Sequence, residues 1–468
     1  MKKAVFTYVF ARYSTVITGL VINAVLSRIL MPADYGIVAV VTVFTAFFNV
    51  LSTLGLGTGV VQNKDLTDGD IEAIFSFTVW IAVAFAMIFF FCAIPISKFY
   101  EDSRYIAVVR VLSISVMFNA LNVIPNAVLL KLEKFNIIAC RMIISAIISG
   151  LVSIGLALID INYWALIIQA ILLSAIQFFW NIASIKIHFH LKIDMSSIKK
   201  IGNYSFYQFA YSIMLYASQN LDNLLLGKTL GSEQLAYYNK SYSVMRYPID
   251  YIPHAISPVL HPILSKFQED PDYIYKKYIS MIKIMSLLGI LISLMFFGEA
   301  SEIIEVLFGS KWAQSVTLFR IFSLGVWVQL INALAGVAYQ STNNTRNMFL
   351  SGLIHVFITL SAIIIGICIS NIDILVVLIV ISWYIKFIIE SHFLIKKSFH
   401  KKVLPYLKNF IPDIVVFAVT GFVAFTLNKY IKGGLFFCIF AKTLIIGAAY
   451  LISCLCFGQI KYFTKEYF

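Results

Sequence analysis

The stretch NLDNLLLGKTLGSEQLAYYNK (residues 220–240) joins two apolar runs near the middle of the chain. Part of it repeats an earlier segment, because VLSRILMPADYG (25–36) aligns with LLGKTLGSEQLA (225–236) at an offset of 200 residues. A second pair of segments, RVLSIS (110–115) and RIFSLG (320–325), aligns at an offset of 210 residues. A nearly constant offset over separate regions is typical of an internal repeat. The sequence therefore predicts two related halves.

The composition of the chain is that of a membrane protein. Of its 468 residues, 60% are hydrophobic and 13% are charged, whereas soluble chains carry roughly 45–50% apolar and about 25% charged residues. A helix that spans a bilayer needs about 20 mostly apolar residues. The apolar runs therefore predict an all-α polytopic membrane protein with about 14 transmembrane helices, in groups of six, six and two. The seventh and eighth runs, about 205–227 and 236–263, are unusually polar.

Basic segments divide these runs into lobes. We expect an N-terminal six-helix lobe at 1–187, a cytoplasmic linker at 188–204 and a second six-helix lobe at 205–397. Two additional transmembrane helices and a short cytoplasmic tail then occupy 398–468. Because six is an even number of spans, both lobes enter the membrane in the same direction and form a parallel repeat. Transporters built in this way bind their substrate between the two lobes.

The net charge of +13 is explained by membrane topology, and we expect no nucleic-acid partner. With a cytoplasmic start, about 21 of the 36 Lys and Arg residues fall on the inner side and about 7 on the outer side. Cytoplasmic loops carry the excess of positive charge in membrane proteins. The sequence therefore predicts a multi-pass protein with cytoplasmic N- and C-termini.

Three of the predicted spans carry a polar stripe at helical spacing. In the first span the stripe contains Arg12, Thr15 and Asn23, and in the eighth span it contains Asn239, Arg246, Asp250 and His254. In the seventh span it contains Gln208, Ser212, Tyr216, Gln219, Asp222 and Asn223. Polar groups inside a membrane face a cavity or one another. We expect these stripes to line a shared water-filled cavity, and hydrogen bonding between packed helices is the alternative.

The charges within the spans indicate an anionic cargo, because cations outnumber acids there. The planar guanidinium of arginine binds phosphate through two parallel hydrogen bonds. Arg12 and Arg246, which lie on two of the polar stripes, are the best candidates for phosphate binding. Lys240, Arg110 and Arg320 are further candidates, and for the two arginines snorkelling to the membrane interface is the alternative.

Ion coupling or gating is a separate hypothesis for four residues of the seventh and eighth spans, which are Asp222, Asn223, Asp250 and His254. An ionisable group inside a membrane is usually functional or paired, and histidine can take up a proton near neutral pH. For Asp222, structural pairing with a cation is the alternative.

Signatures of enzymes are missing from the sequence. It contains no GxxxxGK[ST] loop for ATP, no HExxH and no GxSxG. The six cysteines fall in or beside apolar runs, where small core residues are expected and a metal site is not. We therefore expect no catalytic residues, no metal and no cofactor.

Five segments resemble those of one family. They are LSRILMPADYGI (26–37), IPNAVLLKLEKF (124–135), NLDNLLLGKTLGSEQLAYYNKSYSV (220–244), SPVLHPILSKFQ (257–268) and FGSKWAQSVTLFRIFSLG (308–325). Together they resemble the polysaccharide transporter (Wzx-like) branch of the multidrug/oligosaccharidyl-lipid/polysaccharide exporter superfamily. The resemblance covers nearly the whole chain.

This resemblance implies a fold and a function. The fold is a V-shaped, MATE/MurJ-like bundle of two six-helix lobes with two further helices. The function is translocation of an undecaprenyl-pyrophosphate-linked oligosaccharide to the outer leaflet of the bacterial cytoplasmic membrane, for capsule, exopolysaccharide or O-antigen. A polysaccharide polymerase and a chain-length regulator are the expected protein partners.

Two alternatives stay open from the sequence. A multidrug or toxin extruder of the same superfamily would need an acidic pocket for cationic drugs, and acids are scarce in the spans. A membrane polysaccharide polymerase or ligase usually has a substantial outer loop, and the outer loops here are short.

Overall fold

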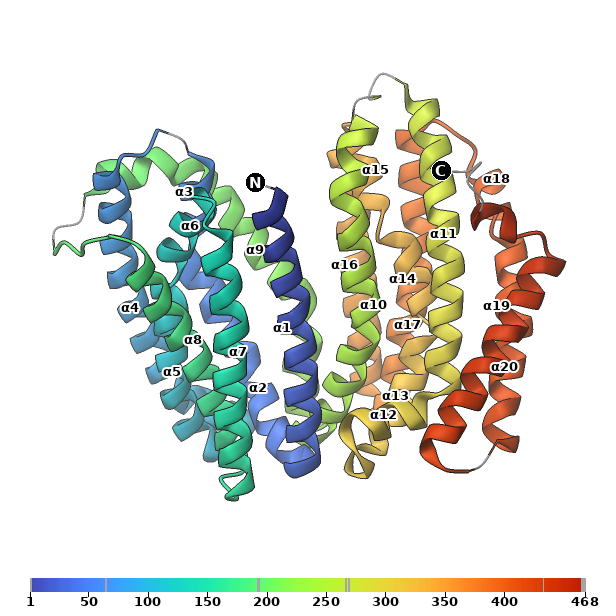
Figure 1. Cartoon of the computed structure of the whole chain (residues 1–468), viewed down its shortest axis with the longest axis horizontal. Coiled ribbons are helices and arrows are strands. Elements are labelled where there is room, and N and C mark those ends of the chain that lie inside the picture. Colours follow the sequence, from blue (N-terminus) through green and yellow to red (C-terminus); the bar gives the residue numbers. More distant parts are fainter. Residues whose placement is uncertain are drawn as a thin grey trace. The chain divides into compact units, whose positions relative to one another are not determined.

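The computed structural model describes the backbone of residues 2–63, 65–191, 194–265, 267, 270–431 and 433–463. Within these ranges it leaves out the side chains of residues 2–6, 8, 201–208, 210–211, 214–215, 217–219, 254–263, 265, 345, 428–429 and 463. The regular elements of the described part are helices (Figure 1). By its contacts the chain splits into two compact units, Met1–Ala236 (unit 1) and Tyr237–Phe468 (unit 2).

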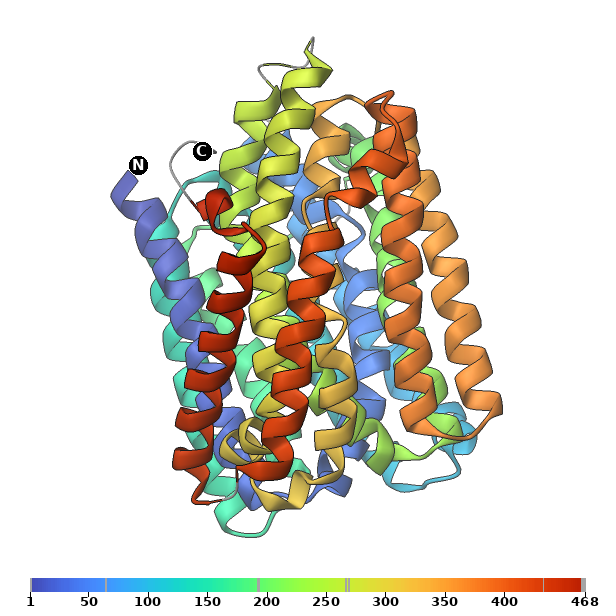
Figure 2. The same cartoon turned by 90° about the vertical axis from the view of Figure 1, so that its right-hand side faces the viewer.

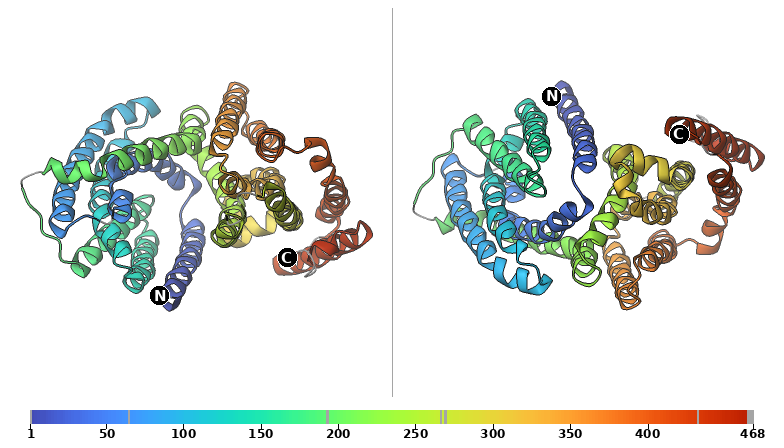
Figure 3. Two further views of the ribbon diagram at one scale, coloured as in Figure 1. Left: turned by 90° about the horizontal axis from the view of Figure 1, so that it is seen from above. Right: turned by 90° about the horizontal axis from the view of Figure 1, so that it is seen from below.

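Unit 1 contains nine helices in the part that the structure describes. They are α1 (Lys2–Ile29), α2 (Pro32–Thr53), α3 (Leu56–Gln62), α4 (Asp68–Tyr100), α5 (Arg104–Leu121), α6 (Val123–Lys131), α7 (Phe135–Leu158), α8 (Trp164–Ser184) and α9 (Met195–Thr229). The helix α10 (Ser232–Ser265) begins in unit 1 and continues into unit 2. Within unit 1, α4 packs on α5 and α1 packs on α7. The helix α9 lies against α2, α3 and α4 (Figure 3).

Unit 2 is built around α11 (Pro271–Gly298). Its other helices are α12 (Ala300–Phe308), η1 (Ser310–Trp312), α13 (Gln314–Ser323), α14 (Val326–Asn332), α15 (Ala335–Ser341), α16 (Thr345–Cys368), α17 (Ile372–Ser391), η2 (His392–Ser398), α18 (Val403–Lys408), α19 (Ile411–Tyr430), α20 (Leu435–Cys456) and η3 (Ile460–Phe463). The core of the unit packs α11 against α14, α15, α19 and α20 through residues such as Ile290, Ile331 and Ile446. Figure 2 shows α19 and α20 beside α11.

Eleven of the described helices are long and apolar enough to cross a membrane. A bent pair, Gln314–Ser323 with Val326–Ser341, would add one more span with a bend of 44°. The prediction of an all-helical polytopic membrane protein is therefore confirmed. The count of 14 spans is not confirmed, because α9 and α10, which lie where the seventh and eighth spans are expected, are not among the eleven.

The division into contact units differs from the predicted lobes at one helix. The helix α9 belongs to unit 1 by its contacts, whereas the sequence analysis assigns residues 205–227 to the second lobe. The predicted lobe boundaries describe membrane topology, and they stay a prediction.

Local sequence explains where the helices of unit 1 begin. Pro32 opens α2, and the Asp34 carboxylate accepts a hydrogen bond from the Met31 amide at 3.0 Å. Proline is favoured at a first helical position, and an acid there meets the positive end of the helix dipole. At the start of α4, Thr67 and Asp70 form a capping box, in which each residue satisfies a backbone amide of the other.

Buried ion pairs hold the two C-terminal helices in unit 2. On α19, the carboxylate of Asp413 accepts hydrogen bonds from Lys283 and, at 2.6 Å, from Ser286 of α11. On α20, Lys442 donates to Glu302 at 2.6 Å. A buried charge is strongly destabilising unless it is paired. These pairs therefore fix α19 and α20 to the core, and Lys283 and Lys442 serve structural roles.

Candidate functional site

Arg246, one of the two best predicted phosphate ligands, already makes a two-point contact in unit 2. Its Nη2 and Nε donate to the two carboxylate oxygens of Asp250 at 2.8 and 3.1 Å. Asp250 lies four residues further along α10, and the guanidinium sits 5.7 Å from the ring centre of Tyr242. The side chains of Arg246 and Asp250 are 35% and 40% exposed. The pair is thus reachable, and its geometry is the one with which arginine binds phosphate.

Lys240 lies in a different environment on the same helix. The residue is 5% exposed, and its ammonium lies 4.6 Å from the ring centre of Phe308 and 5.0 Å from that of Trp312. Aromatic faces attract cations at these distances. The structure therefore gives Lys240 a packing role between α10 and α12, and its predicted contact with substrate stays a prediction.

Arg110 and Arg320, which the sequence repeat aligns, each lie near a phenylalanine ring. The guanidinium of Arg110 lies 5.0 Å from the ring centre of Phe90, and that of Arg320 lies 6.0 Å from the ring centre of Phe297. Each arginine therefore packs against a phenylalanine of a neighbouring helix. Both predicted roles of these arginines, substrate contact and snorkelling, stay predictions.

The predicted stripe of α1 contains one exposed cation and two hydrogen-bonded polar groups. Arg12 is exposed. The hydroxyl of Thr15 donates to the Ala11 carbonyl at 2.8 Å. The Asn23 side-chain oxygen Oδ1 accepts from the Tyr35 hydroxyl of α2 at 3.2 Å and from the Ser27 hydroxyl at 3.3 Å. Asn23 therefore ties α1 to α2, while Arg12 is available for a ligand.

The predicted stripe of α9 is described in part. The hydroxyl of Tyr216 donates to the Val43 carbonyl of α2, and an Asp222 carboxylate oxygen accepts from the Asn223 amide at 2.8 Å. Ser212 and Asp222 are half-buried, as is Asn239 of α10. The buried Asn223 side-chain oxygen has no hydrogen-bond partner among the described residues. Gln208 and Gln219 of α9 and His254 of α10 fall outside the described side chains.

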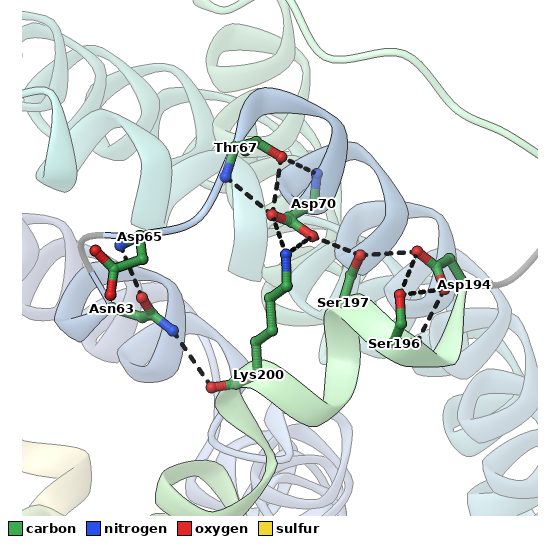
Figure 4. Close-up of polar contacts among 8 residues, drawn as sticks. All are labelled: Asn63, Asp65, Thr67, Asp70, Asp194, Ser196, Ser197 and Lys200. Atoms are coloured by element: carbon green, nitrogen blue, oxygen red, sulfur yellow. Dashed lines mark hydrogen bonds and ion pairs between the residues drawn. The ribbon is translucent and has the colours of Figure 1, made fainter.

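A polar network that the sequence analysis did not predict joins α9 to α4, and we call it the Asp70 network (Asp70, Thr67, Ser197, Lys200; Figure 4). The two Asp70 carboxylate oxygens accept from Lys200 Nζ at 2.7 and 2.8 Å. Ser197 donates to the same carboxylate at 2.7 Å, and the Thr67 hydroxyl donates at 2.8 Å. Asp70 is 6% exposed. The start of α9 is thus fixed to the start of α4 by a satisfied, buried carboxylate.

The linker before α9 makes a second set of contacts with α4. His188 Nδ1 and His190 Nε2 lie 2.7 and 3.0 Å from the two carboxylate oxygens of Glu72. The His188 amide donates to Glu72, and the His190 amide donates to Ser76 at 2.9 Å. Both histidines lie in a segment without regular secondary structure and reach the same carboxylate group. The linker is therefore docked along the first turns of α4.

A buried arginine of unit 1 was also missed. Arg141 of α7 is 5% exposed, and its Nη1 donates to the Asn126 side chain of α6 at 3.0 Å. Asn122 lies at the N-cap of α6, four residues before Asn126. Its side-chain oxygen accepts a hydrogen bond from Asn181 of α8 at 2.7 Å. The signal was present in the sequence, because Arg141 is a cation within an apolar run.

Among the residues that the structure describes, no three His, Cys, Asp or Glu side chains are grouped to hold a metal ion.

Comparison with known proteins gives the family. Residues 25–317 match the family described as Polysaccharide biosynthesis protein, which is more than half of the chain. The chain belongs to this family, and the resemblance to polysaccharide transporters is confirmed.

Individual relatives are distant. The chain is 22% identical to the teichuronic acid biosynthesis protein TuaB of Bacillus subtilis over 62% of this chain and 60% of TuaB. It is 22% identical to the lipopolysaccharide biosynthesis protein WzxC of Escherichia coli over 74% of this chain and 71% of WzxC. The matched part thus spans less than two thirds of TuaB.

Solved structures show the same fold. The lipid II flippase MurJ in an inward closed conformation superposes with a TM-score of 0.70 and 15% identity, over 97% of this chain and 98% of MurJ. An inward-facing multidrug resistance transporter of the MATE family gives a TM-score of 0.63 and 11% identity, over 80% of this chain and 92% of the transporter. The predicted MATE/MurJ-like fold is therefore confirmed.

Proposed function

We propose that the protein is a flippase for an undecaprenyl-pyrophosphate-linked oligosaccharide. It moves this lipid from the inner to the outer leaflet of a bacterial cytoplasmic membrane by alternating access, for capsule, exopolysaccharide or O-antigen synthesis. The observation that carries the proposal is the likeness to the lipid II flippase MurJ over 97% of the chain, in a protein of a polysaccharide biosynthesis family. Cytoplasmic termini and a polymerase and chain-length regulator as partners belong to the same proposal.

Arg246 is the residue that recognises the pyrophosphate in this proposal. Its two contacts with Asp250 show that the guanidinium can present both donors in one plane. A phosphate that replaces Asp250 meets the same donors and carries more charge than a carboxylate. Arg12 is the second ligand because its side chain is exposed. Lys240, Arg110 and Arg320 rank below these two because aromatic rings already cover their cationic groups.

Asp250 links substrate binding to an ion in the same proposal. When phosphate takes Arg246, the Asp250 carboxylate loses these two donors and becomes available to a coupling cation. Binding of the substrate and of the cation then favour each other, as coupling between sites requires. Asp222, Asn223 and His254 are further candidates for coupling.

A flip assay in proteoliposomes tests the proposal. The measured quantity is the rate at which a fluorescent undecaprenyl-pyrophosphate oligosaccharide becomes accessible at the opposite leaflet. We expect Arg246→Ala to slow flipping by about 10- to 100-fold, the effect of losing a charged hydrogen bond. Arg104→Ala is the matched control, because this exposed arginine pairs with Asp102 in the loop before α5. A wild-type protein that does not flip the lipid above the rate of empty liposomes would overturn the proposal.

The multidrug extruder is the second candidate, and the fold likeness to a MATE transporter favours it. The same liposomes distinguish it, because an extruder would move a cationic dye and leave the lipid in place. Membership of the polysaccharide biosynthesis family supports the lipid substrate instead. A polymerase or ligase would lengthen the glycan in the same assay, which mass spectrometry of the lipid would detect.

A further inference from the structure

A pocket of about 700 Å³ lies within unit 1, between α2, α4 and α9. Its walls are the Phe44, Phe47 and Phe48 side of α2, residues around Ile96 of α4 and residues around Leu221 of α9. Protein interiors are close-packed, and voids much larger than a water molecule are few. A space of this size is in the range of ligand pockets. The pocket is therefore large enough to hold a ligand.

The walls of the pocket do not suit water. Among the lining residues that the structure describes, Tyr216 and Asn220 carry a hydroxyl and an amide group. The Tyr216 hydroxyl donates to the Val43 carbonyl, and the Asn220 side-chain nitrogen donates to the Tyr216 carbonyl at 3.0 Å. A water molecule in a pocket needs two to four polar partners, and apolar cavities stay dry and take up apolar ligands. The chemistry of the walls thus points to a hydrocarbon.

The rim of the pocket reaches the surface of unit 1 near the C-terminal ends of α4 and α9. Phe99 lines the pocket and is 44% exposed. On the same stretch of α4, Phe91 and Ile94 are 66% and 46% exposed. In a polytopic membrane protein, such exposed apolar side chains contact lipid. An acyl chain in the bilayer can therefore enter beside Phe99.

The rim also carries a pair of opposite charges. Lys228 Nζ lies 5.4 Å from the ring centre of Phe99 and 2.7 Å from the Glu101 carboxylate. The Glu101 side chain is 80% exposed and that of Lys228 is 34% exposed. A headgroup that contains a phosphate and an ammonium complements both residues, because its phosphate can meet Lys228 and its ammonium can meet Glu101.

We propose that this pocket binds one acyl chain of an aminophospholipid, with its phosphoethanolamine headgroup on Lys228 and Glu101. With a cytoplasmic N-terminus, the ends of α4 and α9 lie on the outer side, so the lipid comes from the outer leaflet. The bound acyl chain packs between α9, α2 and α4. The proposal does not depend on the flippase function, because it concerns lipid binding alone.

The test uses the purified full chain and a photoactivatable phosphatidylethanolamine with a diazirine in mid-chain. We expect crosslinks in peptides that contain Phe47 and Ile96, and about tenfold fewer in Ile96→Trp, whose larger indole obstructs the path of the acyl chain. Ile94→Trp, an exposed position on the same helix, is the matched control. Leu221→Trp obstructs the pocket from α9 if Ile96→Trp fails to fold, and circular dichroism reports the fold of each variant.

Competition by unlabelled lipids identifies the headgroup. We expect phosphatidylethanolamine to compete better than phosphatidylglycerol, and Lys228→Gln with Glu101→Gln to remove this preference. Equal crosslinking in Ile94→Trp and Ile96→Trp would overturn the pocket as the binding site. Stronger competition by undecaprenyl phosphate, or equal competition by all lipids, would overturn the aminophospholipid as the occupant.

Discussion

The Asp70 carboxylate at the start of α4 lies 2.7 Å from the Lys200 ammonium of α9, across 130 residues of sequence. Ser197 and Thr67 donate to the same carboxylate. The buried Asp70 side chain therefore accepts hydrogen bonds from α9 and from the residue that caps α4. The helix that carries the predicted stripe from Gln208 to Asn223 is thereby fixed at its first turns to α4.

Removal of the Asp70 carboxylate should lower the stability of unit 1. We expect Asp70→Ala to lower the free energy of unfolding by about 2–3 kcal/mol, because it removes charged hydrogen bonds and a helix cap. The measurement is unfolding of the detergent-solubilised protein by a denaturing detergent. Asp65→Ala in the neighbouring exposed loop is the control. Equal stability of the two variants would show that the Asp70 network adds nothing.

A swap of charges tests the direction of the same contact. Asp70→Lys or Lys200→Asp alone places two like charges together, which is unfavourable. The double variant restores opposite charges, and we expect it to recover part of the stability, although the Thr67 cap is lost. Double-variant stability below that of both single variants would contradict a direct pairing.

The buried pair of Lys283 and Asp413 should dominate the docking of α19. We expect Asp413→Ala to cost about 3–5 kcal/mol, because it leaves a buried ammonium without its acid. Lys283→Met together with Asp413→Leu should restore most of this loss, since a buried ion pair can be replaced by apolar residues of similar volume. Lys402→Met, at an exposed site before α18, is the control. The check is the same unfolding measurement.

The two copies of the repeated segment touch at Gly36. A Cβ atom at this position would lie 2.3 Å from the Ser232 carbonyl oxygen, so α2 and the start of α10 leave no room for a side chain. We expect Gly36→Ala to destabilise the protein by about 1–3 kcal/mol through overpacking. Gly19→Ala in α1, with nothing within 4 Å, should be neutral or slightly stabilising. An unchanged stability of Gly36→Ala would show that α2 and the start of α10 can move apart to admit a side chain.

Asp102 lies in the loop between α4 and α5, and acidic pH should remove its contribution to the stability of the fold. The hydrogen bond from the Arg104 guanidinium lowers the pKa of Asp102. A carboxyl group with a lowered folded-state pKa stabilises the fold above its unfolded pKa of about 3.9, and the stabilisation is lost as pH falls through the folded-state pKa. We therefore expect Asp102→Asn to lower Tm at pH 7, with a smaller difference from wild type as pH falls below about 4. Asp160→Asn, in an exposed loop, is the control, and a difference independent of pH would contradict the assignment.

Much of the fold could be predicted from the sequence. Long apolar runs predicted the membrane helices, and the aligned segments predicted two related halves, which stays a prediction. The predicted number of about 14 spans is not confirmed, because the polar helices α9 and α10 are not among the eleven apolar ones.

The site was harder to predict because hydrogen-bond partners come from distant segments. The pairing of Arg246 with Asp250 could have been read from their spacing of four residues, which brings side chains together on a helix. The burial of Lys240 could not, because Phe308 and Trp312 lie about 70 residues away and reach it only in the fold. Similarly, the Thr67–Asp70 cap is a local signal, whereas Lys200 is a tertiary partner.

The most direct test of the proposed function is the flip rate of Arg246→Ala in proteoliposomes. We predict a rate about 10- to 100-fold below wild type with an undecaprenyl-pyrophosphate oligosaccharide, partial recovery in Arg246→Lys, and a wild-type rate in Arg104→Ala. A wild-type rate in both Arg246→Ala and Arg12→Ala would contradict the recognition of the pyrophosphate by these arginines.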